Sequence, residues 1–286
     1  IMLIIKKLIE KIFEDEKELI HQKYKENILN LRSTSFKDMQ VEVSEQEGVI
    51  SMHIGSSTIQ SSMRIDNPFH LELDYTQAMA MAVLFLESPK EILFIGLGGG
   101  TMPKFFYKIF PKAKLTILEL NSKVIQIAKY FFKLPISKQR FNILQGDGVK
   151  FIKETKNKYD LLLSDAFEDY GLPEEFCTIS YFESCRNVLS EKGIFMINFW
   201  GSDPKTKIYK DRIKLVFGKQ VLFAESSKPG NIIAFAFNQK NIVYPINILK
   251  KKLKSLEVNH GLDLMVYFGR LIKNNQQGNS KEIRFH

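Results

Sequence analysis

Three acidic residues in this chain occupy positions where a carboxylate could do chemistry. Glu119, Asp147 and Asp165 each end or closely follow a short apolar segment of the kind that forms a buried strand. Because the carboxyl ends of parallel strands meet at one edge of an open α/β sheet, these side chains would lie where such sheets bind ligands. A carboxylate there can accept hydrogen bonds from ribose hydroxyls or take a proton from a reacting group. The alternative for Glu119 is an ordinary surface acid after a strand.

A glycine-rich stretch lies about twenty residues before Glu119, the spacing found in nucleotide-binding α/β folds. Residues 96–101 read Gly-Leu-Gly-Gly-Gly-Thr, and Pro103 stands near an expected helix start. Glycines at 96, 98 and 100 permit a tight turn and a close approach of the backbone to a ligand, which would also meet the free N–H groups of the helix. A dinucleotide reading fits less well, because the third glycine of its GxGxxG pattern would fall on Thr101.

An acidic run follows the third of these acids. Five carboxylates and no Lys or Arg lie between Asp165 and Glu175, in a chain whose net charge is +9. Short-range charges outweigh distant charges that salt screens beyond about 8–10 Å, so this run would attract a cationic substrate. The alternative is a solvated acidic loop with no ligand.

Apolar strands alternate with amphipathic helices from residue 90 onward, which indicates parallel strands joined by helical crossovers. The expected strands are 91–96, 114–120, 141–146 and 159–165, and the expected helices are 103–109, 122–134 and 149–156. Next come a helix with a possible capping box formed by Ser180 and Glu183, a strand at 193–200 and a helix near 205–217.

Two further strands, 220–225 and 231–238, have no helix between them and would close the sheet as an antiparallel hairpin. This ending favours a class I AdoMet-methyltransferase-like (Rossmann-like) sheet of seven mostly parallel strands over a dinucleotide-binding sheet. Short alternating segments between residues 39 and 65 predict a small antiparallel β-unit before it. We therefore expect an N-terminal helix and β-hairpin domain at 1–70 and a nucleoside-binding catalytic domain at 71–286.

Composition narrows the class of protein. The 44% hydrophobic content suits a globular chain, and the positive charge is spread without an arginine-rich arm, so we expect no nucleic-acid partner. Two cysteines and five scattered histidines show neither a disulfide framework nor metal-ligand spacing, which favours a reducing compartment and no metal. The apolar start is too short for a membrane span, and apolar residues at helical spacing within 8–20 predict an amphipathic helix. We expect a cytoplasmic protein without a membrane partner.

Between about residues 39 and 238 the chain resembles the spermidine synthase family of aminopropyltransferases and its methyltransferase-like bacterial relatives. The segment Ser-Thr-Ile-Gln at 57–60 resembles a turn that ends in a nucleoside-contacting glutamine, here Gln60, and Tyr75 resembles the tyrosine of a Tyr-His-Glu segment. Glu119 matches the ribose-binding acid, and Asp147-Gly148 matches the pair that holds the adenine edge.

The same resemblance implies roles in and around the acidic run. Asp165 matches the catalytic aspartate, Glu168 stands for the second acid of a DxxD element, and Pro173 resembles a proline beside the nucleoside, displaced by one residue. The chain departs from the family at Thr76, where the family has His, and at Gly99, where it has Asp, and both positions bind polyamine in the family. A third departure is Gln77 in place of Glu. The nucleoside-binding set is kept while the amine-binding set is partly lost.

The resemblance implies an enzyme that moves an aminopropyl group from decarboxylated S-adenosylmethionine to a small cationic amine of the polyamine type. In that hypothesis Asp165 takes the proton of the amine, Glu168 anchors a second ammonium and Tyr75 lines the pocket. One alternative is a methyltransferase that uses S-adenosylmethionine itself, and another is a non-catalytic nucleoside-binding module. We expect a homodimer.

Overall fold

The computed structural model describes residues 41–55, 58–137, 139–167, 171–226, 230–275 and 281–284. The amphipathic helix expected within 8–20 lies outside these residues, as does Glu168. None of the helices in the described part of the chain has the length and apolar character that crossing a membrane requires.

The small antiparallel unit predicted from the sequence is a three-stranded sheet. Its strands β1 (Val41–Gln46), β2 (Val49–Ile54) and β3 (Ile59–Arg64) lie in the order β1-β2-β3. Glu47 and Gly48 both have positive φ, at 51° and 76°, so they make the kind of tight hairpin turn whose twist matches the strands. Buried residues of this sheet belong to the same hydrophobic cluster as the larger sheet, and the division at residue 70 stays a prediction.

The central sheet has seven strands in the order β6-β5-β4-β7-β8-β10-β9. Neighbours from β6 to β8 pair in parallel, while β10 is antiparallel to both β8 and β9. This arrangement confirms the predicted fold class, including the closing hairpin. The strands are β4 (Glu91–Ile95), β5 (Lys114–Glu119), β6 (Phe141–Gln145), β7 (Tyr159–Ser164), β8 (Leu189–Trp200), β9 (Val221–Glu225) and β10 (Asn231–Phe237).

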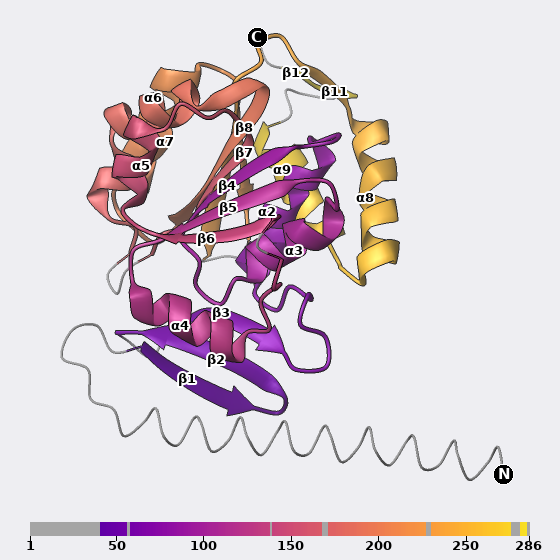
Figure 1. Cartoon of the computed structure of the whole chain (residues 1–286). Coiled ribbons are helices and arrows are strands. Elements are labelled where there is room, and N and C mark those ends of the chain that lie inside the picture. Colours follow the sequence, from indigo (N-terminus) through magenta and orange to yellow (C-terminus); the bar gives the residue numbers. More distant parts are fainter. Residues whose placement is uncertain are drawn as a thin grey trace, which may run out of the picture.

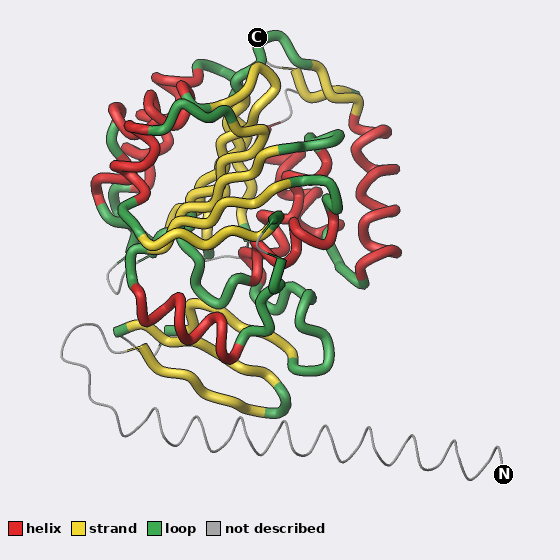
Figure 2. Tube along the Cα trace, in the orientation of Figure 1, coloured by secondary structure: helices red, strands yellow, loops and turns green. Residues whose placement is uncertain are grey.

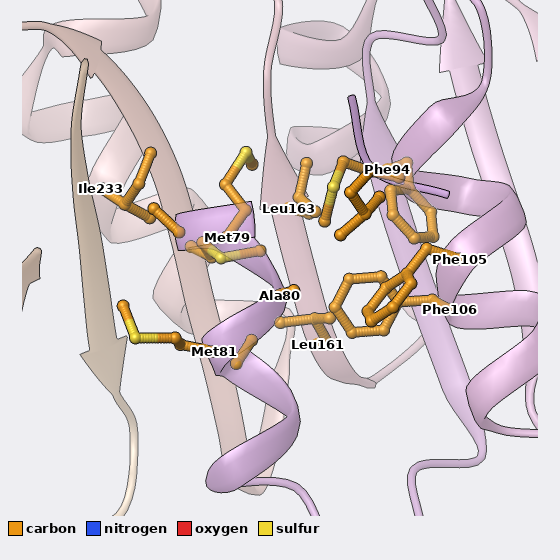
Figure 3. Close-up of a cluster of buried hydrophobic side chains, with 14 of the residues drawn as sticks. Met79, Ala80, Met81, Phe94, Phe105, Phe106, Leu161, Leu163 and Ile233 are labelled. Carbon is orange, nitrogen blue, oxygen red and sulfur yellow. The ribbon is translucent and has the colours of Figure 1, made fainter. Parts of the chain in front are cut away.

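Both faces of the sheet are buried, which explains why its strands read as continuous apolar runs. Alternate residues point to opposite sides: Phe94 and Leu163 belong to one hydrophobic cluster, while Leu93 and Leu162 belong to the other. Figure 3 shows the first cluster, where Met79 and Met81 lie near strand residues from β4, β7 and β10.

Helices cover the two faces unequally (Figures 1 and 2). The face that includes Phe94 packs against α2 (Asp74–Ala80), α3 (Thr101–Ile109), α4 (Ser122–Phe131), α8 (Ile246–His260) and α9 (Met265–Asn275). The opposite face packs against α5 (Gly148–Glu154), α6 (Ile179–Asn187) and α7 (Thr206–Phe217). Neighbouring strands β4 and β7 are followed by helices on opposite faces, and this is where open α/β sheets form a ligand crevice.

Several helix boundaries differ from the expected ones, and two of these differences have a clear local cause. Helix α4 ends at Phe131 instead of residue 134, because Lys133 adopts a left-handed φ of 46° and Pro135 follows shortly after. At the start of α6, the Thr178 hydroxyl accepts a hydrogen bond from the Tyr181 backbone N–H at 3.1 Å. Thr178 is thus the cap, and the predicted capping box that began at Ser180 was wrong.

The C-terminal elements after residue 238 were not predicted from the sequence. Beyond this residue lie β11 (Val243–Pro245), helices α8 and α9, and β12 (Glu282–Arg284), which pairs with β11. Helix α9 packs along the edge strand β9. The Asn275 side chain there accepts from Phe223 N at 2.9 Å and donates to Phe223 O at 2.7 Å, as a neighbouring strand would.

Candidate active site

The glycine loop that leaves β4 is pressed against the end of β7. Gly96 has a φ of +95°, and a Cβ on it would lie 2.3 Å from the carbonyl oxygen of Asp165. The Asp165 N–H donates to the Ile95 carbonyl at 2.8 Å, which fixes the two strand ends together. Only glycine fits at position 96, because both its φ and its contact with backbone exclude a side chain.

Glu119 is held in place by backbone donors on either side of it. Its Oε2 accepts a hydrogen bond from Leu97 N at 3.0 Å, and its Oε1 accepts from Asn121 N at 2.9 Å. Each carboxylate oxygen can accept a further hydrogen bond, because each has two lone pairs. The carboxylate is thus fixed between the glycine loop and the start of α4 with acceptor capacity left for a ligand.

Asp147 has a structural role as the N-terminal cap of a helix. It caps α5, and its Oδ1 accepts from Val149 N at 2.8 Å and from Lys150 N at 3.1 Å. The adjoining Gly148 is buried, and a Cβ there would lie 2.4 Å from Ile95 Cγ2. The backbone at 148 is therefore packed directly against β4.

Asp165 is the carboxyl group with the most strongly perturbed acidity at the end of the sheet. Burial raises its pKa from the ordinary value of 3.8 to about 6, and a hydrogen bond from Asn198 Nδ2 to its Oδ1, at 2.9 Å, opposes that rise. Burial, with a smaller contribution from the charge of Asp165, also holds the pKa of Tyr75 well above its usual value. The Tyr75 hydroxyl donates to the Gln60 carbonyl at 3.0 Å.

One cavity of about 310 Å³ brings most of the predicted site residues together. Its lining includes nine of them: Gln60, Tyr75, Gly96, Gly98, Glu119, Asp147, Gly148, Asp165 and Pro173. Gly100 is not part of the lining; it begins α3 with a φ of +70° and packs against Leu134. Glu168 belongs to the segment that the structure does not describe.

The cavity also contains residues that the sequence reading did not single out. Asn198 and Trp200 lie two positions apart on β8 and line the cavity, and so does Asn231, which pairs with Trp200 across the sheet. Asn198 is 1% exposed and Trp200 46% exposed. The sequence feature that could have indicated Asn198 as a site residue is its position as an asparagine in a mostly apolar segment of the strand.

Two residues of the acidic run, Glu174 and Glu175, have different surroundings. Glu174 faces Lys205, with 3.6 Å between its carboxylate and the ammonium, so it forms a surface ion pair. Glu175 lines the cavity. Among the described residues, no group of three or more His, Cys, Asp or Glu side chains is placed to hold a metal ion.

Comparison with known proteins assigns the chain to a family. Residues 72–226 match the sequence model of the spermine/spermidine synthase domain. A polyamine aminopropyltransferase of Chromobacterium violaceum is 35% identical over 238 residues, which are 83% of this chain and 91% of that one. The chain belongs to the spermine/spermidine synthase family.

A second sequence relative supports the spermine/spermidine synthase family, and two solved structures share the fold. A polyamine aminopropyltransferase of Neisseria meningitidis serogroup B is 35% identical over 225 residues, covering 78% of this chain and 86% of that one. A probable spermidine synthase from Corynebacterium glutamicum has a similar fold, with a TM-score of 0.67, 18% identity and 88% of each chain covered. Human methyltransferase-like protein 13 in complex with SAH gives a TM-score of 0.60 at 22% identity, covering 67% of this chain and 94% of that one.

In this member of the spermine/spermidine synthase family, the three residues that differ from the family pattern, Thr76, Gln77 and Gly99, make packing contacts or hydrogen bonds within the fold. A Cβ on Gly99 would lie 2.5 Å from the Phe132 ring, so the aromatic side chain fills the space that an aspartate would need. The Thr76 hydroxyl donates to the Leu73 carbonyl, and the Gln77 side-chain amide donates to the Leu71 carbonyl at 3.0 Å.

Proposed function

We propose that this chain transfers an aminopropyl group from decarboxylated S-adenosylmethionine to a small amine of the polyamine type. The relatives named polyamine aminopropyltransferase, which align over most of both chains, support the reaction class. The observation that carries the proposal is the charge of the cavity. Among the described residues, its lining holds four carboxylates, from Glu119, Asp147, Asp165 and Glu175, and no Lys, Arg or His.

This charge pattern fits a donor with two positive charges. Decarboxylated S-adenosylmethionine carries a sulfonium and a propylammonium and no carboxylate, whereas S-adenosylmethionine adds a carboxylate that the four acids would repel. A cavity for S-adenosylmethionine would need donors for that carboxylate. The glycine-loop N–H groups could supply them, but those of Leu97 and Gly99 already donate to Glu119 and Ser61.

The nucleoside part of the donor has a place along the glycine loop. Glu119 would accept hydrogen bonds from the ribose hydroxyls, since one of its oxygens bonds the loop, the other bonds the start of α4, and both keep acceptor capacity. Gln60, Asp147, Gly148 and Pro173 would surround the adenosine, and Gly96 and Gly98 let the backbone approach it. A solved spermidine synthase of similar fold is in complex with the transition state analogue AdoDATO, which supports an adenosyl ligand here.

The transfer itself needs a neutral amine aligned with the carbon beside the sulfonium. At neutral pH the acceptor amine is largely protonated, so a carboxylate must take its proton before nitrogen can attack. Asp165 would take that proton. As the new C–N bond forms, the C–S bond breaks and its electron pair stays on sulfur, which leaves as neutral methylthioadenosine. The proton on Asp165 then passes to solvent.

The raised pKa of Asp165 suits this role. A base works best when its pKa lies near the operating pH, and burial brings the pKa of Asp165 to about 6. Tyr75 would border the acceptor amine as part of the wall beside Asp165. Glu168, on the loop after Asp165, would anchor the second ammonium of the acceptor.

Calorimetric titration of the two donors tests this reading of the cavity. We expect decarboxylated S-adenosylmethionine to bind more tightly than S-adenosylmethionine. The difference in affinity between the two donors should be smaller than in relatives that keep an aspartate at position 99. Tighter binding of S-adenosylmethionine, with methyl transfer and no aminopropyl transfer, would instead make the chain a methyltransferase.

We further propose a homodimer that works in the cytoplasm without nucleic acid or membrane. The reducing compartment implied by the two unpaired cysteines, Cys177 and Cys185, supports the location. Light scattering after size exclusion would test the dimer.

A further inference from the structure

Asn198 is a polar residue at a position that the strand pattern assigns to the core. On β8, Ile194, Met196 and Asn198 share one face, and the first two belong to the hydrophobic cluster of that face. Asn198 pairs with the buried Ile233 of β10. An apolar side chain of similar size would continue this packing, so the presence of an amide calls for a physical explanation.

The hydrogen bonds of Asn198 identify what the amide does. Its Nδ2 donates to Asp165 Oδ1 at 2.9 Å, while its Oδ1 is buried and has no hydrogen-bond partner among the described residues. An ionised carboxylate only accepts hydrogen bonds, so the NH₂ group must face Asp165 and the carbonyl must face away. A buried carbonyl without a partner disfavours folding. The Asn198 side chain therefore donates a hydrogen bond to Asp165 while its own carbonyl oxygen stays without a partner among the described residues.

We propose that Asn198 is a positioning residue that holds the Asp165 carboxylate in one orientation and in its ionised form, ready to take the proton of the acceptor amine. This inference rests on the proposed function. The rigid sheet makes Asn198 suitable, because its strand β8 pairs with β7 up to Ile197 and Ser164, the residues just before Asn198 and Asp165. Two adjacent strand ends thus fix both partners of the hydrogen bond.

Within the described part of the chain, few other charged or titratable groups face Asp165. Tyr75, on α2, is the titratable neighbour whose charge is coupled to that of Asp165, and its pKa lies well above its usual value, so it stays neutral at neutral pH. The other carboxylates that line the cavity are Glu119, Asp147 and Glu175. They would disfavour ionisation of Asp165 by like-charge repulsion, which the donor from Asn198 counteracts.

Two substitutions of nearly equal size test the inference. Asn198→Leu removes the donor, and Asn198→Asp replaces the donor by a second carboxylate. Asn198→Leu should move the acidic limb of the pH profile of kcat/KM upward, by about one pH unit or more, because the ionised form of Asp165 loses its partner. Asn198→Asp should also change the acidic limb, because the two carboxyl groups would share a proton and titrate as a pair. At pH 7 the Leu variant should lose about twofold in kcat/KM from the smaller ionised fraction of Asp165, and more from the lost orientation of the carboxylate, while its affinity for methylthioadenosine changes less than about twofold.

A control and a second readout separate this role from a structural one. Ile197→Val shortens the neighbouring side chain, which faces the opposite cluster, and should lower the melting temperature without moving the acidic limb. Relative to the parent chain, Asn198→Leu should melt higher at pH 5 than at pH 7, because the cost of leaving Asp165 without its donor arises only where that group is ionised. If the Leu variant does not fold, the isosteric Asp variant decides. An unchanged acidic limb in a folded Asn198 variant overturns the inference.

A titration of the Asp165 carboxyl by ¹³C NMR makes the result independent of turnover. Suppose that the Asp165 pKa is higher in Asn198→Leu than in the parent chain, but the parent chain shows no aminopropyl transfer. This result would refute the proposed function and keep the role of Asn198. Equal Asp165 pKa values in a chain that does transfer aminopropyl groups would keep the function and refute the role of Asn198.

Discussion

Glu119 illustrates how a single residue can serve the scaffold and a ligand together. Its two oxygens accept backbone N–H groups from Leu97 and Asn121, so its position is set before any ligand arrives. A ribose that donates to the same oxygens therefore meets a carboxylate that needs no reorganisation, which lowers the entropic cost of binding.

Glu119→Ala should weaken binding of methylthioadenosine by roughly 1.5–3 kcal/mol, the range for hydrogen bonds to a charged group. Calorimetric titration measures this loss. Glu174→Ala is the matched control, because Glu174 forms its ion pair with Lys205 and does not line the cavity. Equal affinities in the two variants would contradict the assignment of Glu119 to the ribose.

Asp165 makes the folded chain less stable at neutral pH. Its folded-state pKa of about 6 exceeds the ordinary value of 3.8, so between these pH values the folded chain binds more protons than the unfolded chain. Stability from this group therefore falls as pH rises from about 4 to about 6, by about 3 kcal/mol in all. Such a cost is typical of a residue kept for chemistry.

Residue types at strand ends predicted most of the candidate site, because topology brings those ends together. Asn198 and Trp200 were missed for a physical reason. Each lies in the last strand before the closing hairpin, and only the pairing of β7 with β8 brings them beside Asp165. Sequence spacing cannot show which strands become neighbours in the sheet.

At the scale of elements, apolar runs predicted every strand of the central sheet and the small antiparallel unit. Errors arose at helix ends, where one backbone conformation or one side-chain bond decides the boundary. Lys133 ends α4 through its left-handed φ, and Thr178 caps α6 through its hydroxyl. Neither feature has a periodic signal in the sequence.

The junction of β4, the glycine loop and β7 should tolerate no side chain at position 96. Gly96→Ala should lower the free energy of unfolding by more than about 3 kcal/mol, because the new Cβ would meet the Asp165 carbonyl and the φ of +95° is unfavourable for alanine. Chemical denaturation measures the change, and nucleoside binding should be lost with it.

Two other glycines provide matched controls for that substitution. Gly261→Ala meets no atom within 4 Å but keeps a φ of +64°, so it should cost only about 1 kcal/mol. Gly269→Ala, inside α9 with nothing within 4 Å, should be neutral or stabilise the chain by up to about 1 kcal/mol. Equal costs for Gly96 and Gly261 would show that the contact with Asp165 is unimportant.

Across the whole molecule, the C-terminal elements were the largest part that the sequence did not predict. Helices α8 and α9 complete the cover on the face of the sheet that includes Phe94, and α9 protects the edge strand β9 through Asn275. An amphipathic helix can be recognised from its period, but its partner strand cannot.

Across the whole molecule, charge is distributed unevenly between the cavity and the rest of the chain. The chain has a net charge of +9, yet the described part of the cavity lining contains four carboxylates and no Lys or Arg. Salt screens the charges of Lys and Arg residues that lie more than about 8–10 Å from the cavity. In the proposed function, the local field of the cavity matches both a doubly cationic donor and an amine acceptor.

Identification of the products formed from decarboxylated S-adenosylmethionine and a diamine such as putrescine tests the central claim most directly. Mass spectrometry should find methylthioadenosine and the aminopropylated diamine in equal amounts. Asp165→Asn should form them at least about 100-fold more slowly while it still binds methylthioadenosine, because the amide keeps the shape of the carboxylate and cannot take the proton. Absence of both products with the parent chain, or methylated amine formed from S-adenosylmethionine instead, would contradict the account.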